Sequence, residues 1–212
     1  YYGGRSVFGD SFDEMMAAVD QADSAQYQME DILEPSGWTL LNFLMDARTG
    51  LGRFREFRIS NYQLMMQLID DCRSHTIEEI LELPDVKERV DLFMQHAASF
   101  KQQLERCSTV YDKVVVVDLR EEETIWPGNR FMIYAMYPDT QVSIHCLWGK
   151  DKQNTVFAVG KSIVNRISQA NLGSLCLEYD GGGHRNAGTC QVDHDDAKRV
   201  LGELVEKLNA TS

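Results

Sequence analysis

The sequence predicts an α/β (α+β) protein, in which a helical N-terminal portion is followed by a mixed-sheet α/β domain. Two observations lead to this fold class. Apolar residues recur at helical spacing from Phe12 to about Cys107. Near Val110 the composition changes, and short β-branched runs such as Lys113–Leu119 begin to alternate with helical segments. The predicted domains are therefore 1–108 and 109–212.

Capping signals mark the helices of the first half. Ser11 and Glu14 have the spacing of a capping box. Further helix starts are expected at Ser36, Ser60, Thr76 and Pro84, the last because proline suits the first turn of a helix. In the helix after Ser60, the apolar residues expected on one face are Leu64, Met65, Leu68 and Ile69. The helix that begins at Pro84 is expected to run to about Cys107.

The second half alternates strands with shorter helices. A buried strand is expected at 113–119, and a hairpin of two strands at 142–148 and 155–159. A final strand is expected at 188–192. Helices are expected at 129–137, at 171–179 and from Asp195 or Asp196 to the C-terminus.

Length and composition limit the classes of function. The 212 residues suffice for one large or two small domains, and the formal charge of −12 argues against broad electrostatic binding of long nucleic acids. The net charge does not exclude a local basic pocket for a short anionic substrate. Apolar runs are too short to span a membrane. The five scattered cysteines suggest buried thiols in a reducing cytoplasm.

The most informative stretch is the glycine run Gly181-Gly182-Gly183, which His184 and Arg185 follow directly. Glycine lets a backbone approach a ligand closely, and its N–H groups together with His and Arg suit an anion or phosphate. Lys161 and Ser162 end a predicted strand, and Asn171 starts a short helix, so these groups could converge on one anion. The alternative is a glycine-rich surface turn.

Three other polar segments allow a functional and a structural interpretation. The loop after Arg48 contains Arg53 and Arg55, which could present guanidinium groups to phosphate or could simply be solvated. Asp193–Asp196 has the composition of a metal cluster, but its position at a helix start favours capping. The role of His145, in a predicted strand, is undecided.

The second half resembles the DHH-associated domain of the DHH phosphoesterase superfamily. The most specific element is Gly181-Gly182-Gly183-His184, with Ala187 and Gly188 behind it. More broadly, the chain is similar to the branch described as exopolyphosphatase-related, through segments 30–33, 37–38, 46–54, 61–66 and 128–134. This resemblance implies a phosphoesterase whose active site lies between two domains, with His184 binding substrate. Lys161 and Ser162 stand where many members have Arg-Ser.

In the family, two divalent ions, usually Mn²⁺, activate water and neutralise the phosphate. Their ligands come from Asp-x-Asp, a separate Asp, Asp-His-His and a final Asp. This sequence has no Asp-His-His, and only Asp23 matches the final aspartate. We therefore interpret the chain as the later two-thirds of a longer enzyme and expect it to be inactive alone.

The predicted function is the substrate-binding portion of a Mn²⁺-dependent phosphoesterase for short oligonucleotides or nucleotide phosphates. One alternative is a non-catalytic binding module that lost the metal motifs, and another is an exopolyphosphatase acting on polyphosphate. The expected location is the cytoplasm, and a homodimer is an option because helical halves of such enzymes often pair. Arg53 and Arg55 are expected to face the substrate cleft.

Overall fold

The computed structural model describes residues 12–54 and 56–211. The predicted capping box at Ser11 and the predicted binding residue Arg55 lie outside the described residues. The chain divides into two compact units. The first comprises Tyr1–Ala97 with Pro127–Arg130, and the second comprises Ala98–Trp126 with Phe131–Ser212. The predicted α/β fold class is confirmed, since helices dominate the first unit and a mixed sheet the second.

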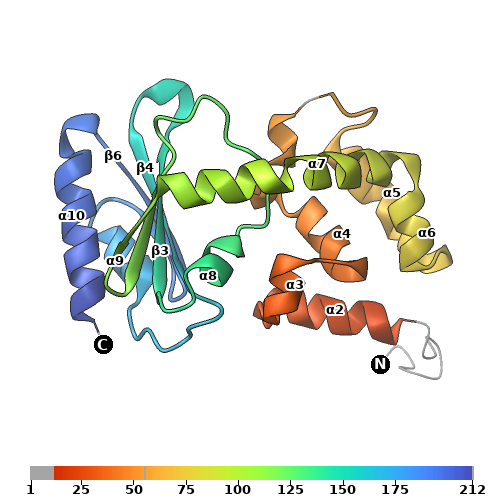
Figure 1. Ribbon diagram of the computed structural model, residues 1–212, viewed down its shortest axis with the longest axis horizontal. Helices are drawn as coiled ribbons and strands as arrows, with labels where there is room; N and C mark the ends of the chain where they lie inside the picture. Colours follow the sequence, from red (N-terminus) through yellow and green to blue (C-terminus); the bar gives the residue numbers. More distant parts are fainter. Residues whose placement is uncertain (1–11, 55, 212) are drawn as a thin grey trace. The chain divides into compact units, whose positions relative to one another are not determined.

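The first unit consists of helices and two short 3₁₀ turns (Figure 1). In chain order its elements are α2 (Asp13–Ser24), α3 (Met29–Leu33), α4 (Gly37–Met45), η1 (Ala47–Thr49), η2 (Leu51–Arg53), α5 (Asn61–Ser74), α6 (Ile77–Glu82) and the first turns of α7 (Pro84–Cys107).

Helices begin at the predicted positions of this unit, and two of these starts have local caps, whereas Ser36 precedes α4 without a side-chain capping bond. Ser60 and Thr76 each complete a capping box, with Gln63 and Glu79 respectively, and α7 runs from Pro84 to Cys107 as predicted. One face was wrong. Leu64 and Leu68 are buried, whereas Met65 and Ile69 are 52% and 58% exposed, because only the first pair points into the core.

The core of the first unit is aliphatic, but it includes one buried arginine. Side chains of α4, η2, α5, α6 and α7 form the cluster Leu40, Leu41, Leu44, Leu51, Leu64, Leu68, Ile77, Ile80, Val86 and Phe93. Beside it, Arg89 of α7 is 0% exposed. Its guanidinium donates to Asn61 Oδ1 at 3.0 Å, to the Asp85 carbonyl at 2.6 Å and to the Ile59 carbonyl at 2.8 Å. The buried charge therefore ties α7 to the start of α5.

The second unit is built on a mixed sheet. Its strands are β1 (Ser108–Tyr111), β2 (Val114–Asp118), β3 (Val142–Trp148), β4 (Thr155–Lys161), β5 (Gly182–His184) and β6 (Ala187–Val192), in the spatial order β1-β2-β3-β4-β6-β5. β2 and β3 run parallel, and the other neighbours are antiparallel. The helices are α8 (Met132–Met136), α9 (Leu172–Leu177) and α10 (His194–Ala210), with the 3₁₀ turn η3 (Lys150–Lys152).

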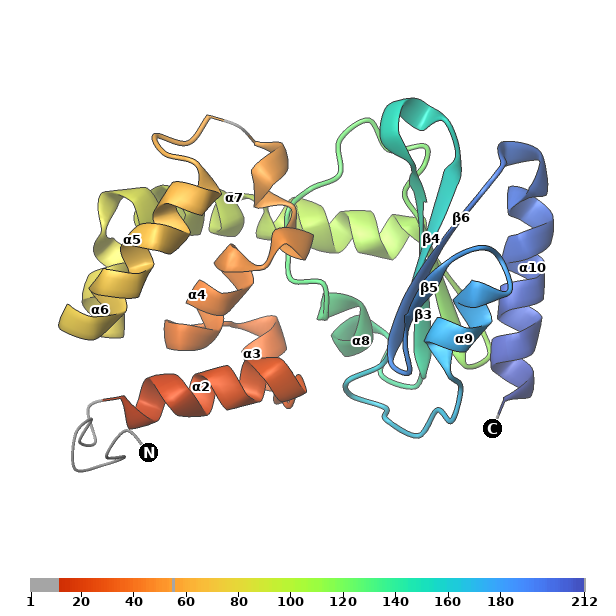
Figure 2. The same ribbon diagram turned by 180° about the vertical axis from the view of Figure 1, so that it is seen from behind.

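The sheet carries helices on both faces. Both views of the ribbon show α9 and α10 on one face and α8 on the other (Figures 1 and 2). The α9 and α10 face holds the apolar core, in which Val142, Ile144 and Cys146 of β3 meet Phe157 and Val159 of β4. The alternate residues of each strand therefore point to the opposite face.

Two strands, β1 and β5, and one helix boundary differ from the sequence prediction. β1 was missed because three of its four residues are exposed, so it has no apolar alternation. The helix expected at 129–137 is the shorter α8. Asn129 is instead fixed outside the helix, where its buried amide donates to the Ile32 carbonyl at 3.1 Å.

The structure bears on the predictions about the cysteines and about membrane spans. Cys146, Cys176 and Cys190 are buried free thiols as predicted, while Cys72 and Cys107 are only half-buried. Across residues 12–54 and 56–211, none of the helices combines the length and the apolar character that a membrane crossing requires.

Candidate functional site

The glycine run forms one strand of a tight hairpin. Gly182–His184 is the edge strand β5, which pairs with β6 so that Gly183 lies opposite Gly188 and His184 opposite Ala187. Arg185 and Asn186 form the turn between the two strands. The sequence predicted a loop here, and that was wrong for these three residues. Since glycines have no side chains, no alternation in the sequence marks such a strand.

The glycines of this hairpin have two different environments. A Cβ on Gly173 of α9 would lie 2.7 Å from the carbonyl carbon of Gly183, and a Cβ on Gly188 would lie 2.7 Å from Cys176 Sγ. Gly183 also has a φ of 149°, which side chains rarely allow. A Cβ on Gly182 would meet no atom within 4 Å. Most of these glycines therefore let α9 pack directly on the hairpin, and Gly182 leaves open space.

The hairpin turn joins the segments that the sequence analysis expected to converge. The Arg185 carbonyl accepts from Leu172 N at 3.2 Å, at the start of α9. The Asn186 carbonyl accepts from Lys161 N at 3.0 Å, at the end of β4. Asn171 caps α9 as expected, by accepting from the backbone N–H of Ser174 at 3.2 Å.

The predicted side chains are divided between the two faces of the sheet. Lys161 pairs with Val142 and so lies on the α9 face, where its Nζ donates to the Ser168 carbonyl at 3.0 Å. Burial, and then the charge of Arg185, lower the pKa of Lys161. His184 lies on the opposite face and is exposed. Its Nδ1 accepts from the backbone N–H of Asn186 at 3.2 Å, and no hydrogen bond of Nε2 is found among the described residues.

Ser162 has a defined structural contact. It is 3% exposed, and its Oγ accepts from the backbone N–H groups of Val164 at 3.2 Å and Asn165 at 2.9 Å. The hydroxyl therefore fixes the turn that follows β4. This turn leads into the segment that carries Ser168, the partner of Lys161.

Among the described arginines of segment 48–58, which are Arg48, Arg53 and Arg58, Arg53 is the one without an acidic partner. Arg48 donates to Asp46 at 2.7 Å, and Arg58 lies 3.7 Å from Asp85. Burial raises the pKa of Asp46, but hydrogen bonds from Arg48 outweigh it and leave the pKa below its usual value. Arg53 is exposed, and no acidic partner for it is found in the described ranges. Partial desolvation lowers its pKa.

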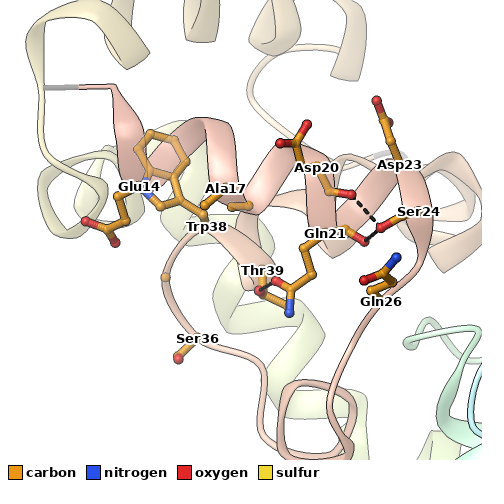
Figure 3. Close-up of a pocket in the computed structure, with 12 residues that line it drawn as sticks. Glu14, Ala17, Asp20, Gln21, Asp23, Ser24, Gln26, Ser36, Trp38 and Thr39 are labelled. Atoms are coloured by element: carbon orange, nitrogen blue, oxygen red, sulfur yellow. Dashed lines mark hydrogen bonds between the residues drawn. The ribbon is translucent and has the colours of Figure 1, made fainter. Parts of the chain in front are cut away.

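Asp23 lies in an open hollow of about 1160 Å³ between α2 and α4 (Figure 3). The hollow is also lined by Glu14, Asp20, Gln21 and Trp38. In the close-up, Ser24 turns back to the α2 backbone, where its Oγ donates to the Asp20 carbonyl at 2.6 Å. The lining is acidic, so this hollow by itself does not suit a phosphate.

The described residues do not fit the two-ion centre that the family resemblance implies. Within residues 12–54 and 56–211, no three His, Cys, Asp or Glu side chains gather in a metal-binding arrangement. Asp23 could supply one carboxylate at most. Asp193–Asp196 begins α10, with Asp195 and Asp196 in its first turn, as helix-dipole complementarity predicts. Asp193 makes no side-chain capping bond there, so that part of the expectation was wrong.

Comparisons with known proteins now identify the family. No protein-family model matches the chain, and no curated protein matches it either. Among solved structures, the chain is similar to the pGpG-specific phosphodiesterase PggH from Vibrio cholerae. The two share 56% identity over 100% of this chain and 71% of that one, with a TM-score of 0.91.

Two more distant structures were also found. An exopolyphosphatase-related protein from Bacteroides fragilis is 14% identical over 69% of this chain and 42% of its own, with a TM-score of 0.46. A DHH domain from a protein described as a member of a ribosomal-protein family is 15% identical over 64% of this chain and 33% of its own, with a TM-score of 0.42. These two are too distant to support an argument. The similarity to PggH, together with the glycine–histidine hairpin, identifies the chain as a member of the DHH superfamily of phosphoesterases.

Proposed function

We propose that this chain is the substrate-binding portion of a phosphodiesterase that acts on short oligonucleotides such as pGpG. The observation that supports it best is the 56% identity to a pGpG-specific phosphodiesterase over the whole of this chain. At that identity, the groups that bind substrate in the relative are expected to have counterparts here. The proposed location is the cytoplasm.

His184 is proposed to bind a phosphate of the substrate. It sits at the tip of the β5–β6 hairpin, exposed, with one ring nitrogen fixed by Asn186 N. Orienting one nitrogen in this way presents the other to a ligand. Arg185 adds an exposed guanidinium beside it, which can bind a phosphate through two N–H groups.

The other predicted binding residues are proposed to position the hairpin or to add positive charge for the phosphate. Gly181 and Gly183 hold the hairpin against α9, and Gly182 keeps the surface beside His184 open. Lys161 contributes positive charge from the other face, and Ser162 fixes the turn behind it. Arg53 of the first unit is proposed as a further phosphate ligand, because it is exposed and no acidic partner for it is found among the described residues.

Replacing His184 with alanine is expected to weaken pGpG binding about tenfold to a hundredfold, the effect of losing a hydrogen bond to a charged group. Calorimetric titration of the 212-residue chain with pGpG measures it. His75→Ala is the matched control, because His75 lies at the end of α5 in the first unit. Equal pGpG affinity for His184→Ala and the unsubstituted chain would contradict the assignment. Tighter binding of polyphosphate than of pGpG would favour the exopolyphosphatase alternative.

The chain alone is expected to show no Mn²⁺-dependent hydrolysis of pGpG. In the family, metal ions supply the activated water, and no metal-binding group gathers in the described ranges. The measurement is release of mononucleotide from pGpG with and without added Mn²⁺, with a complete homologue such as PggH as the positive control. Turnover by this chain comparable to the homologue would show that its metal ligands have been misjudged.

A further inference from the structure

The sheet of the second unit has a second surface that the His184 assignment does not use. Strand pairing places His184 on the face opposite α9, and the residues on this face can be followed from strand to strand. In the row next to His184, Gly182 pairs with Thr189, Thr189 with Ala158, Ala158 with His145 and His145 with Val117. We call this row the His145 row.

Most of the His145 row consists of small or absent side chains. A Cβ on Gly182 would meet nothing within 4 Å, Thr189 is exposed, and Ala158 is half-buried. Tyr134 of α8 forms a wall along one side, since its hydroxyl lies 2.8 Å from Ser143 Oγ and donates to the Gly160 carbonyl at 3.0 Å. The residues from Gly182 to His145 therefore form a strip of the sheet with short side chains, which we call the trough.

His145 ends this trough and is chemically unusual. The residue is half-buried, and desolvation of its ring lowers its pKa to about 4. No hydrogen bond or ion pair of the imidazole is found within the described parts of the chain, and because the residue is only half-buried, its ring nitrogens stay accessible to a ligand. Since strand residues alternate between faces, the ring points into the same face as His184. A half-buried imidazole at the end of the trough, without a partner among the described residues, is therefore available to hydrogen-bond a ligand.

The charge of this face suits an anionic ligand. The chain carries a net charge of −12. In the described strands, however, none of the residues on this face is acidic: they are Ser108, Val110, Val115, Val117, Ser143, His145, Leu147, Val156, Ala158, Gly160, Gly182, His184, Ala187, Thr189 and Gln191. The negative side chains lie elsewhere. A nucleotide could therefore lie along the trough without meeting a carboxylate of the strands.

We propose that His145 is a positioning residue that hydrogen-bonds a purine base of the oligonucleotide whose phosphate is bound at His184. This inference rests on the proposed function. His145 and His184 lie three strands and two residues apart, which corresponds to roughly 16 Å at about 4.8 Å per strand and about 3.3 Å per residue. That separation is comparable to an extended dinucleotide. The small residues between them would leave room for the sugar and the stacked base.

The neutral imidazole has the right chemistry for this contact. It carries one N–H donor and one acceptor nitrogen. Purine bases carry an acceptor nitrogen, N7, that pyrimidine bases lack. In single strands this edge of the base is free to accept a hydrogen bond from a protein. The N–H of His145 would donate to N7 or, in guanine, to O6. Because the ring stays neutral at physiological pH, the contact does not depend on protonation.

The test compares binding of pGpG with binding of ribose 5-phosphate, which has a phosphate but no base. His145→Ala is expected to weaken pGpG binding about tenfold or more and to leave ribose 5-phosphate unchanged. His145→Gln keeps a neutral donor and acceptor, so it should recover part of the affinity. Ala158→Leu keeps the His145 side chain but places a larger side chain directly beside it, and it should weaken pGpG binding as well. His75→Ala again serves as the matched control.

The outcomes separate this inference from the proposed function. If His184→Ala weakens pGpG binding while both His145→Ala and Ala158→Leu bind it normally, the proposed function stands and the role of His145 is wrong. If the unsubstituted chain does not bind pGpG at all, both the proposed function and the proposed role of His145 are wrong. Circular dichroism of each variant establishes that it is folded, and a folded His145→Gln that binds more weakly than His145→Ala would also overturn the inference.

Discussion

Replacing Gly183 with alanine is expected to lower the free energy of unfolding by about 3 kcal/mol or more. Two effects contribute. The φ of 149° is strained for any residue with a side chain. The new Cβ would also press against the Ala187 carbonyl oxygen and lie 2.5 Å from the Cα of Gly188, both backbone atoms of β6 that cannot move independently. Chemical denaturation followed by circular dichroism measures the change.

Gly182→Ala is the matched control, one residue away on the same strand. A Cβ at Gly182 meets no atom within 4 Å, and its φ is not in the positive range. We expect this variant to be as stable as the unsubstituted chain or slightly more so, by about 0.4–1 kcal/mol, because alanine restricts the unfolded chain. Similar losses of stability in the two variants would contradict the distinction between packing glycines and an open glycine.

Gly183→Ala and Gly182→Ala together distinguish two roles of the glycine run, which are packing and ligand contact. A run of glycines followed by histidine suggests ligand contact, and the sequence alone cannot separate that use from packing. Here Gly183 is needed where β5 meets β6, Gly188 is needed where α9 approaches the hairpin, and Gly182 borders the trough on the opposite face. Loss of activity in a Gly183 variant would therefore reflect lost folding as well as lost binding. Gly182 is the position at which binding can be tested separately.

Much of the fold could be predicted because local signals and burial agree. The capping boxes at Ser60 and Thr76 and the proline at the start of α7 depend on neighbouring residues alone. The hairpin of β3 and β4 also appears in the sequence as two apolar runs around a polar turn. β1 and β5 could not be predicted, because an exposed strand and a glycine strand carry no apolar alternation.

The residues of the candidate site remain a prediction, and the sequence could indicate only part of their geometry. The convergence of Lys161, Leu172 and the hairpin turn depends on backbone hydrogen bonds between distant segments. That Lys161 and His184 occupy opposite faces follows from strand register, which the sequence does not specify. His145 could be located in a strand, but its face and its lack of a partner within the described residues became visible only once the neighbouring strands were aligned.

Arg89→Ala is expected to destabilise the first unit by about 3–5 kcal/mol, the cost of breaking a buried charge network. Arg89 is fully buried, and its guanidinium lies 4.0 Å from the ring centre of Phe57. Its removal leaves the Ile59 and Asp85 carbonyls and the Asn61 side chain without their shared donor. Since a buried acceptor without a partner is costly, the loss exceeds that of the packing alone.

Arg58→Ala is the control for this prediction, because it removes the same charge at the surface. The Arg58 side chain is 66% exposed and lies 3.7 Å from Asp85, so its ion pair is screened by water. We expect a change of less than about 1 kcal/mol for it. Thermal and urea unfolding of both variants give the comparison. Equal stability of the two would mean that the guanidinium of Arg89 contributes no more than a surface charge, and that the aliphatic cluster alone holds α7 to α5.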